Sequence, residues 1–131
     1  MTASEASLQG GELLTAISTR LVGLMREHYG RGPVQAKTYA FDDVLLCILR
    51  DDGSLPVEQT LLERGEPERV VELRQAFQRL MVPRYREEIE RLSGRKVLAL
   101  LGQTHVEPNL TIELFLMDGR VGATTAETAE A

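Results

Sequence analysis

The chain has 131 residues, of which 43% are hydrophobic and 27% are charged, and its formal net charge is −5. This length and composition fit one globular domain that can bury a core without disulfides or a metal. The negative net charge argues against nucleic-acid binding, which needs a basic face to neutralise phosphates.

Cysteine content and hydropathy indicate where the protein works. Cys47 is the only cysteine, so the chain cannot form an internal disulfide, and we expect a reducing, cytoplasmic setting. The first residues, MTASEASLQGGE, lack the basic and apolar regions of a signal peptide. The longest apolar run, Val44 to Leu49, is far shorter than the roughly 20 residues that span a bilayer. We therefore expect a soluble protein with no transmembrane segment of its own.

The first half of the chain predicts a helix followed by a β-hairpin. Residues 1–11 are small and polar, and we expect them to be disordered. Apolar residues then recur at three- and four-residue steps, which predicts a helix over residues 12–29. Gly30 follows it as a helix stop with a left-handed backbone angle. The alternating stretch 34–41 predicts a strand, and the apolar stretch 44–50 predicts a second, central strand covered on both faces.

The second half predicts two helices and a second hairpin. Ser54 is a good N-cap for a short helix that ends near Arg64. Residues 67–93 carry a long helical apolar stripe, and a Ser-Gly pair marks its end. Residues 96–106 and 110–117 predict two strands joined by a Glu-Pro-Asn turn.

Together these elements predict an α+β fold in the order helix, hairpin, helix, helix, hairpin. The two hairpins pair into a four-stranded antiparallel sheet packed with helices, in a single domain over residues 12–118. The tail 119–131 has no packing pattern, and we expect it to be disordered. Because strand 44–50 needs two covers and the helices are few, we expect a homodimer.

The last strand has two faces of different character. Its side chains alternate between the two sides of the predicted sheet. One face carries Leu110, Ile112, Leu114 and Leu116, and the other carries Thr111, Glu113, Phe115 and Met117.

No catalytic, metal or cofactor site is visible in the sequence. Cys47 lies in the most apolar run, where a buried thiol is inert. His28, on the apolar stripe of the first helix, and His105 stand apart from any cluster with metal-ligand spacing, so we expect structural roles for both. We therefore predict a protein without metal, cofactor or enzymatic activity, although residues distant in sequence can meet in the fold.

The segment Gly30-Arg31-Gly32-Pro33 allows two interpretations. Its backbone N–H groups and its arginine suit an anion. It follows a helix, however, whereas phosphates bind at helix N-termini, and it matches neither a Walker A loop nor the dinucleotide fingerprint. We interpret it as a structural corner and keep the alternative that Arg31 also touches a ligand or partner.

Two charged segments also remain open to interpretation. Asp42 and Asp43 predict a tight turn, whose exposed carboxylates could contact a partner. Residues 64–96 hold nine of the fifteen basic residues together with six glutamates. This mixture is typical of a solvated helix face, and the sharper alternative is a basic strip that meets anionic lipid or an acidic partner.

Four segments carry a family resemblance: GRGPVQAKTYAFDD, SLPVEQTLLERG, IERLSGRKV and VEPNLTIELFLMD. In these segments the chain is similar to the MpsC-like family, which is named for component C of a Na+-translocating membrane potential-generating system. The resemblance covers about residues 12–118. It implies a small soluble bacterial protein linked to integral membrane partners of cation or inorganic-carbon uptake, and it brings no established catalytic residues.

The resemblance and the residues together predict a non-enzymatic accessory or regulatory subunit, cytoplasmic or peripheral at the membrane, with an integral membrane transport partner. The alternative is a dimeric sensor of a small molecule or anion that uses the Gly30–Pro33 corner. The expected ligand or partner contacts are Gly30, Arg31, Gly32, Pro33, Lys37, Tyr39, Asp42 and Asp43.

Overall fold

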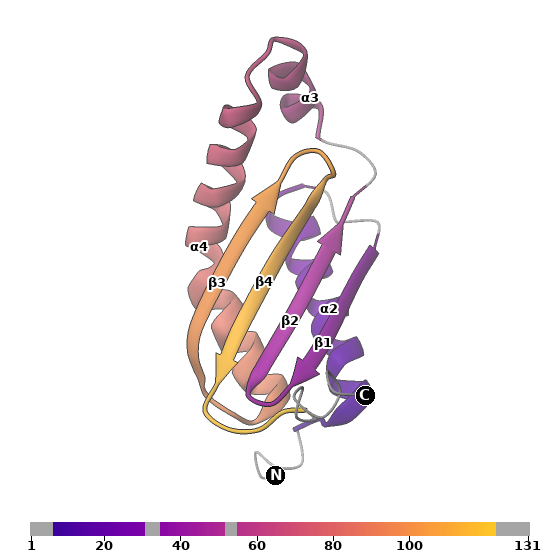
Figure 1. The fold of residues 1–131 in the computed structure, drawn as a ribbon, viewed down its shortest axis with the longest axis vertical. Helices are drawn as coiled ribbons and strands as arrows, with labels where there is room; N and C mark the ends of the chain where they lie inside the picture. Colours follow the sequence, from indigo (N-terminus) through magenta and orange to yellow (C-terminus); the bar gives the residue numbers. More distant parts are fainter. Residues whose placement is uncertain (1–6, 31–34, 52–54, 123–131) are drawn as a thin grey trace, which may run out of the picture.

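The computed structural model describes residues 7–30, 35–51 and 55–122. In chain order its elements are α2 (Gly10–His28), β1 (Gln35–Phe41), β2 (Val44–Arg50), α3 (Pro56–Glu63), α4 (Pro67–Ser93), β3 (Val97–His105) and β4 (Leu110–Met117). The four strands form one antiparallel sheet in the order β1-β2-β4-β3 (Figure 1). The predicted α+β fold and its element order are confirmed, and β2 is a central strand as expected.

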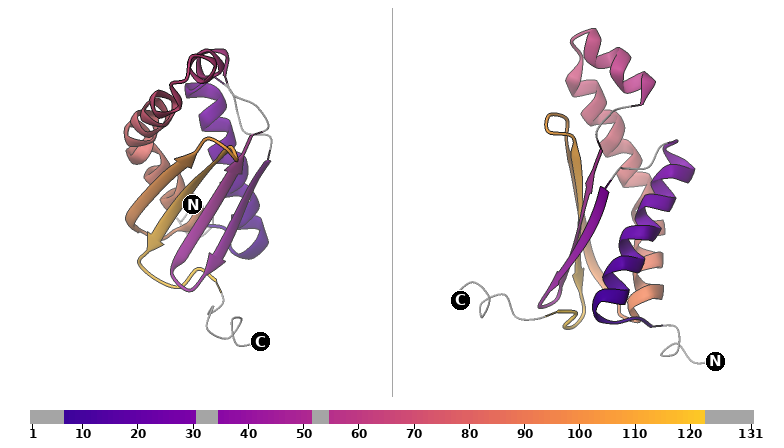
Figure 2. Two further views of the ribbon diagram at one scale, coloured as in Figure 1. Left: turned by 45° about the horizontal axis from the view of Figure 1, so that its top comes forward. Right: turned by 90° about the vertical axis from the view of Figure 1, so that its right-hand side faces the viewer.

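Two helices cover one face of the sheet. Helix α2 lies against β1 and β2, and α4 lies against β3 (Figure 2). Leu13, Ile17, Leu21 and Leu24, spaced three or four residues apart, form the buried stripe of α2. An ion pair of 2.7 Å between Arg20 and Glu88 joins α2 to α4. His28 departs from the expected stripe, because it is exposed while Leu13, Ile17, Leu21 and Leu24 are buried.

The helix ends use backbone conformations that the sequence only partly predicts. Gly30, after α2, has a φ of 104°, and Gly94, after α4, has a φ of 71°. These positive angles are accessible to glycine at little cost. The N-cap of α3 is Leu55 and not Ser54, which lies outside the described residues. Glu58 takes over part of the capping, because its carboxylate accepts the Leu55 N–H at 3.3 Å.

The packed part of the chain extends a little beyond the expected limits of residues 12 and 118. At one end, the Leu8 N–H donates to the Leu92 carbonyl at 2.9 Å. At the other end, the Val121 N–H donates to the Asp42 carbonyl at 2.6 Å. Both Leu8 and Val121 also pack against the core.

The two faces of the sheet have different surroundings. The helix-covered face buries Leu45, Cys47 and Leu49 of β2 with Phe115 and Met117 of β4. On the other side, which we call the open face, no element of the described chain covers the strands (Figure 2). The register aligns its side chains in cross-strand rows: Phe41-Val44-Leu116-Ala99, Tyr39-Leu46-Leu114-Leu101, Lys37-Ile48-Ile112-Gln103 and Gln35-Arg50-Leu110-His105. The predicted second cover of β2 is therefore not supplied by the described residues.

Candidate functional site

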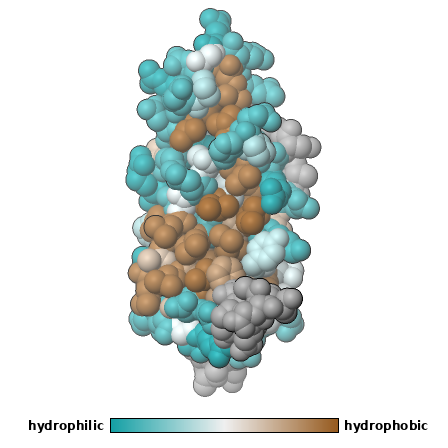
Figure 3. All heavy atoms as spheres, viewed as in Figure 1, coloured by the Kyte–Doolittle hydropathy of each residue, from teal (hydrophilic) through white to brown (hydrophobic). Residues whose placement is uncertain are grey.

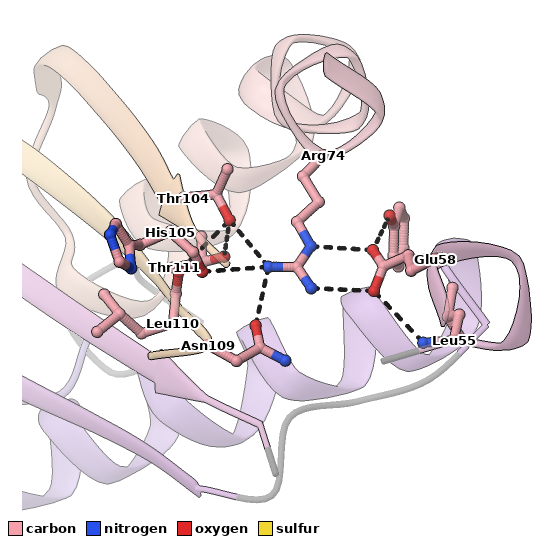
Figure 4. A network of polar contacts seen from close by, with 9 residues as sticks. Leu55, Glu58, Arg74, Thr104, His105, Asn109, Leu110 and Thr111 are labelled. Atoms are coloured by element: carbon pink, nitrogen blue, oxygen red, sulfur yellow. Dashed lines mark hydrogen bonds and ion pairs between the residues drawn. The ribbon is translucent and has the colours of Figure 1, made fainter. Parts of the chain in front are cut away.

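A buried ion pair lies at the end of the sheet where β3 turns into β4. Arg74, in the second turn of α4, points at Glu58 of α3 (Figure 4). The contact is bidentate, with 2.9 Å between Arg74 Nε and Glu58 Oε2 and 2.9 Å between Nη2 and Oε1. The side chains are only 11% and 3% exposed. A planar guanidinium facing a carboxylate in this way makes one of the stronger side-chain contacts in proteins.

Further hydrogen bonds connect this pair to the other elements. The Tyr29 hydroxyl at the end of α2 donates to Glu58 at 2.5 Å. The remaining Arg74 nitrogen, Nη1, donates to Asn109 Oδ1 at 2.8 Å and to Thr104 Oγ1 at 3.2 Å. The network therefore joins the ends of α2, α3, α4 and the β3–β4 turn.

The network also sets the charge of its members. Burial alone would raise the pKa of the Glu58 carboxyl, but the hydrogen bonds from Arg74 and Tyr29 and the charge of Arg74 hold that pKa below its ordinary value. Burial and then the hydrogen bond to Glu58 raise the pKa of Tyr29 well above its ordinary value. The Glu58–Arg74 pair is therefore ionised and Tyr29 is neutral near pH 7.

A small cavity of about 50 Å³ lies beside the network. Its lining includes Glu58, Arg74 and Thr111 of the network together with Tyr85 and Glu113. This volume accommodates a few water molecules, since one water needs roughly 10–15 Å³. A nucleotide would fit only if several of the surrounding side chains moved.

Glu113 is an acidic residue in the core beside this cavity. It lies on the helix-covered face of β4 and is 2% exposed. Its hydrogen-bond partner is Gln78 of α4, whose Nε2 donates at 3.2 Å. Burial raises the pKa of Glu113 to about 8. Burial first and then the nearby Glu113 charge raise the pKa of Tyr85 above its ordinary value.

Gly102 makes room for the partner of Glu113. Gly102 belongs to β3 and lies beside Glu113 of β4, and a Cβ there would come within 2.6 Å of Gln78 Cδ and 2.7 Å of its Cγ.

We expect Gly102→Ala to displace Gln78, break its hydrogen bond to Glu113 and lower the free energy of unfolding by about 1–3 kcal/mol in urea denaturation. The matched control is Gly23→Ala on α2, where the added Cβ has no atom within 4 Å apart from its chain neighbours and the backbone of its own helix. The control should gain about 0.5–1 kcal/mol. Equal stability of the two variants would contradict this role of Gly102.

The structure separates the residues predicted as contacts. Gly30 adjoins Tyr29 and hence the network, whereas Arg31, Gly32 and Pro33 lie outside the described residues. Asp42 and Asp43 form the β1–β2 turn, and Asp42 has a φ of 51°. Strand β1 runs between Gly30 and this turn, so about 20 Å separates the two predicted contact regions (Figure 1).

Lys37 and Tyr39 lie on a third surface. Both belong to edge strand β1 and lie on the open face, where the Lys37 ammonium is 5.4 Å from the centre of the Tyr39 ring. Tyr39 is 39% exposed. Figure 3 shows apolar side chains gathered over much of this face.

Sequence reasoning missed the residues of the buried network, and one signal could have found them. Arg74 occupies a position of the buried stripe of α4, between Val70 and Met81. Glu113 occupies the same strand face as Phe115 and Met117. A charged residue at a position that periodicity assigns to the core predicts a buried partner.

The remaining candidates for metal binding or nucleophilic chemistry are the acidic side chains, Cys47 and the histidines. Within residues 7–30, 35–51 and 55–122 no three His, Cys, Asp or Glu side chains gather in a way that could hold a metal ion. Burial raises the pKa of Cys47 to about 11, so its thiol is protonated and a poor nucleophile. His105 is exposed, and its Nδ1 lies 2.9 Å from the Pro108 carbonyl.

Comparison with known proteins gives one match. A family model described as Na+-translocating membrane potential-generating system (MpsC) matches residues 9–119. No curated protein and no solved structure matches the chain. Among the described helices, none combines the length and the apolar character that crossing a bilayer requires.

Proposed function

This chain belongs to the MpsC family, and from that premise we propose that it is a non-enzymatic accessory subunit of a Na+-translocating membrane potential-generating system. It acts on the cytoplasmic side as a homodimer. It docks peripherally on an integral membrane partner that transports cations or inorganic carbon. Its task is to bind and regulate that partner, and the chemistry of ion movement belongs to the partner.

The open face is the observation that carries this proposal, because it indicates that the chain works within an assembly and not alone. Leu101 is 64% exposed and Leu98 is 59% exposed on β3, next to the apolar rows of β2 and β4. Soluble monomers rarely leave a contiguous apolar surface of this kind in water, and such surfaces mark protein contacts. A large apolar face is suited to binding proteins, whereas the cavity beside the buried network, at about 50 Å³, is far smaller than the roughly 300–1,000 Å³ of typical small-molecule pockets.

The alternative, a sensor that uses the Gly30–Pro33 corner, has less support. Arg74 is the basic side chain that lines the cavity next to this corner. Its donors are engaged by Glu58, Asn109 and Thr104, so it offers little to an added anion. Sensing would have to rest on the corner itself, and a panel of nucleotides, phosphate and bicarbonate that raised the melting temperature would support it.

Loss of membrane potential in the native host tests the accessory role. We expect deletion of the gene to lower the Na+-dependent membrane potential, measured with a potential-sensitive dye, and the wild-type chain to restore it. Leu101→Asp, on the open face, should fail to restore the potential. Leu80→Asp is the matched control, because Leu80 is 79% exposed on α4 and lies away from the sheet. An unchanged potential after deletion would contradict the proposal.

Recovery of the partner tests the docking step. The tagged wild-type chain should bring down an integral membrane transport subunit from gently solubilised membranes of the same host. If cross-linked membranes yield the chain without any such subunit, the accessory role is wrong.

A further inference from the structure

We infer that a second copy of this chain covers the open face. The two sheets pack face to face and are reversed end to end, so that the β1–β2 turn of each copy lies over the opposite end of the other sheet. This inference rests on the homodimer in the proposed function and goes beyond it, because it names the contact surface and the arrangement of the two copies. Tyr39, Leu46, Leu114 and Leu101 form the cross-strand row at the centre of the contact.

The apolar rows supply the middle of the contact. The central row and the row Phe41-Val44-Leu116-Ala99 are apolar apart from the Tyr39 hydroxyl, whereas the next row ends in Lys37 and Gln103. Figure 3 shows the corresponding apolar area on this side of the molecule. Two sheets packed about 10 Å apart bury such side chains between them, as in a β-sandwich.

The charges at the two ends of the face identify a second copy as the occupant. The basic end carries Lys37 and Arg50, and the end with the β1–β2 turn is acidic on balance, because Asp42, Asp43 and Asp118 lie there beside Arg120. Lys37, Arg50, Asp42 and Asp43 all belong to β1, β2 or their connection, so they lie in the same half of the sheet, toward its β1 edge. A surface that is basic at one end and acidic at the other is complementary to itself when it is reversed end to end.

A twofold axis through the central row produces this reversal. The axis runs across the strands, between the two sheets, and places the central row of each copy on that of its mate. Residues two apart along a strand are about 6.6 Å apart. The β1–β2 turn lies slightly more than one row from the axis on one side, and Lys37 and Arg50 lie one and two rows away on the other. Each acidic turn therefore faces the basic end of the other copy.

Sedimentation of the full chain tests the contact surface. We expect the wild type to be a dimer at about 50 μM, and Leu101→Asp to raise the dimer dissociation constant by more than tenfold, because each dimer contains two such changes. Leu80→Asp should leave the dissociation constant unchanged, although Leu80 is at least as exposed as Leu101. Circular dichroism should show that both variants are folded. A wild-type chain that is monomeric, or a Leu101→Asp chain that dimerises like the control, would overturn the inference.

A charge swap tests whether the two sheets are reversed end to end. Arg50→Glu and Asp43→Arg should each raise the dissociation constant by about fivefold or more, and the double variant should return it close to the wild-type value. If the single changes weaken the dimer and the double change weakens it further, the two sheets are not reversed end to end. A wild-type chain that is monomeric in solution and still recovers the membrane subunit would overturn the inference while leaving the accessory role intact.

Discussion

Replacing Arg74 with leucine is expected to lower the free energy of unfolding by about 3–5 kcal/mol, the cost of removing one partner from a buried ion pair. The substitution leaves the Glu58 carboxylate, which is 3% exposed, with the Tyr29 hydroxyl and the Leu55 N–H as its remaining partners. It also leaves Asn109 Oδ1 and Thr104 Oγ1 without the Arg74 N–H. Because domains of this size are stable by about 5–15 kcal/mol, much of the total stability would be lost.

Urea denaturation of the Arg74→Leu variant measures this loss, and two further variants make the result specific. Arg69→Leu is the matched control, because Arg69 lies on the same helix, is 65% exposed and meets Glu66 only at 3.5 Å. Its effect should stay within about 0.5 kcal/mol. The double variant Glu58→Leu/Arg74→Leu should lose less unfolding free energy than the two single variants lose together, since it leaves no unpaired charge. A loss below about 1 kcal/mol for Arg74→Leu would show that the buried ion pair contributes little to the stability of the fold.

Periodicity in the sequence was sufficient for the order of elements and for the division of each strand into two faces. The alternation in 34–41 predicted the strand, and in the structure Lys37 and Tyr39, two residues apart, lie on one face of β1. The same alternation separated Leu114 from Glu113 on β4. Periodicity does not state which face the helices cover. In β4 the more apolar face is open and the face that contains Glu113 is buried, which is the reverse of the arrangement that hydrophobicity alone favours.

The parts that the sequence could not predict depend on contacts between distant segments. Glu58, Arg74 and Asn109 are separated along the chain, and only the approach of α3 and α4 to the β3–β4 turn makes them neighbours. Local composition presented Arg74 as one of many arginines in a mixed-charge helix. Gln78 likewise has no sequence feature that associates it with Glu113, because their contact depends on the space left by Gly102.

Replacing Glu113 with glutamine is expected to stabilise the protein in alkaline solution and to leave it nearly unchanged in acid. The folded pKa of Glu113 is about 8, against an ordinary value of 4.5. Between these two pH values the folded chain keeps a proton that the unfolded chain has released. Stability therefore falls as pH rises from about 4.5 to about 8 and is level on either side of this window. The total change is on the order of 5 kcal/mol, since each pH unit corresponds to about 1.4 kcal/mol.

Glutamine suits this position because its carbonyl oxygen can still accept the Gln78 N–H without carrying a charge. The measurement is the difference in unfolding free energy between Glu113→Gln and wild type at pH 5, 7 and 9. In that difference the contributions of other groups, such as Glu58, cancel. Glu72→Gln is the matched control, because it removes the same charge from an exposed position of α4. The difference should grow steadily between pH 5 and 8 for Glu113→Gln only. A flat difference would mean that water from the neighbouring cavity solvates the Glu113 carboxylate, and the core would then tolerate its ionised form.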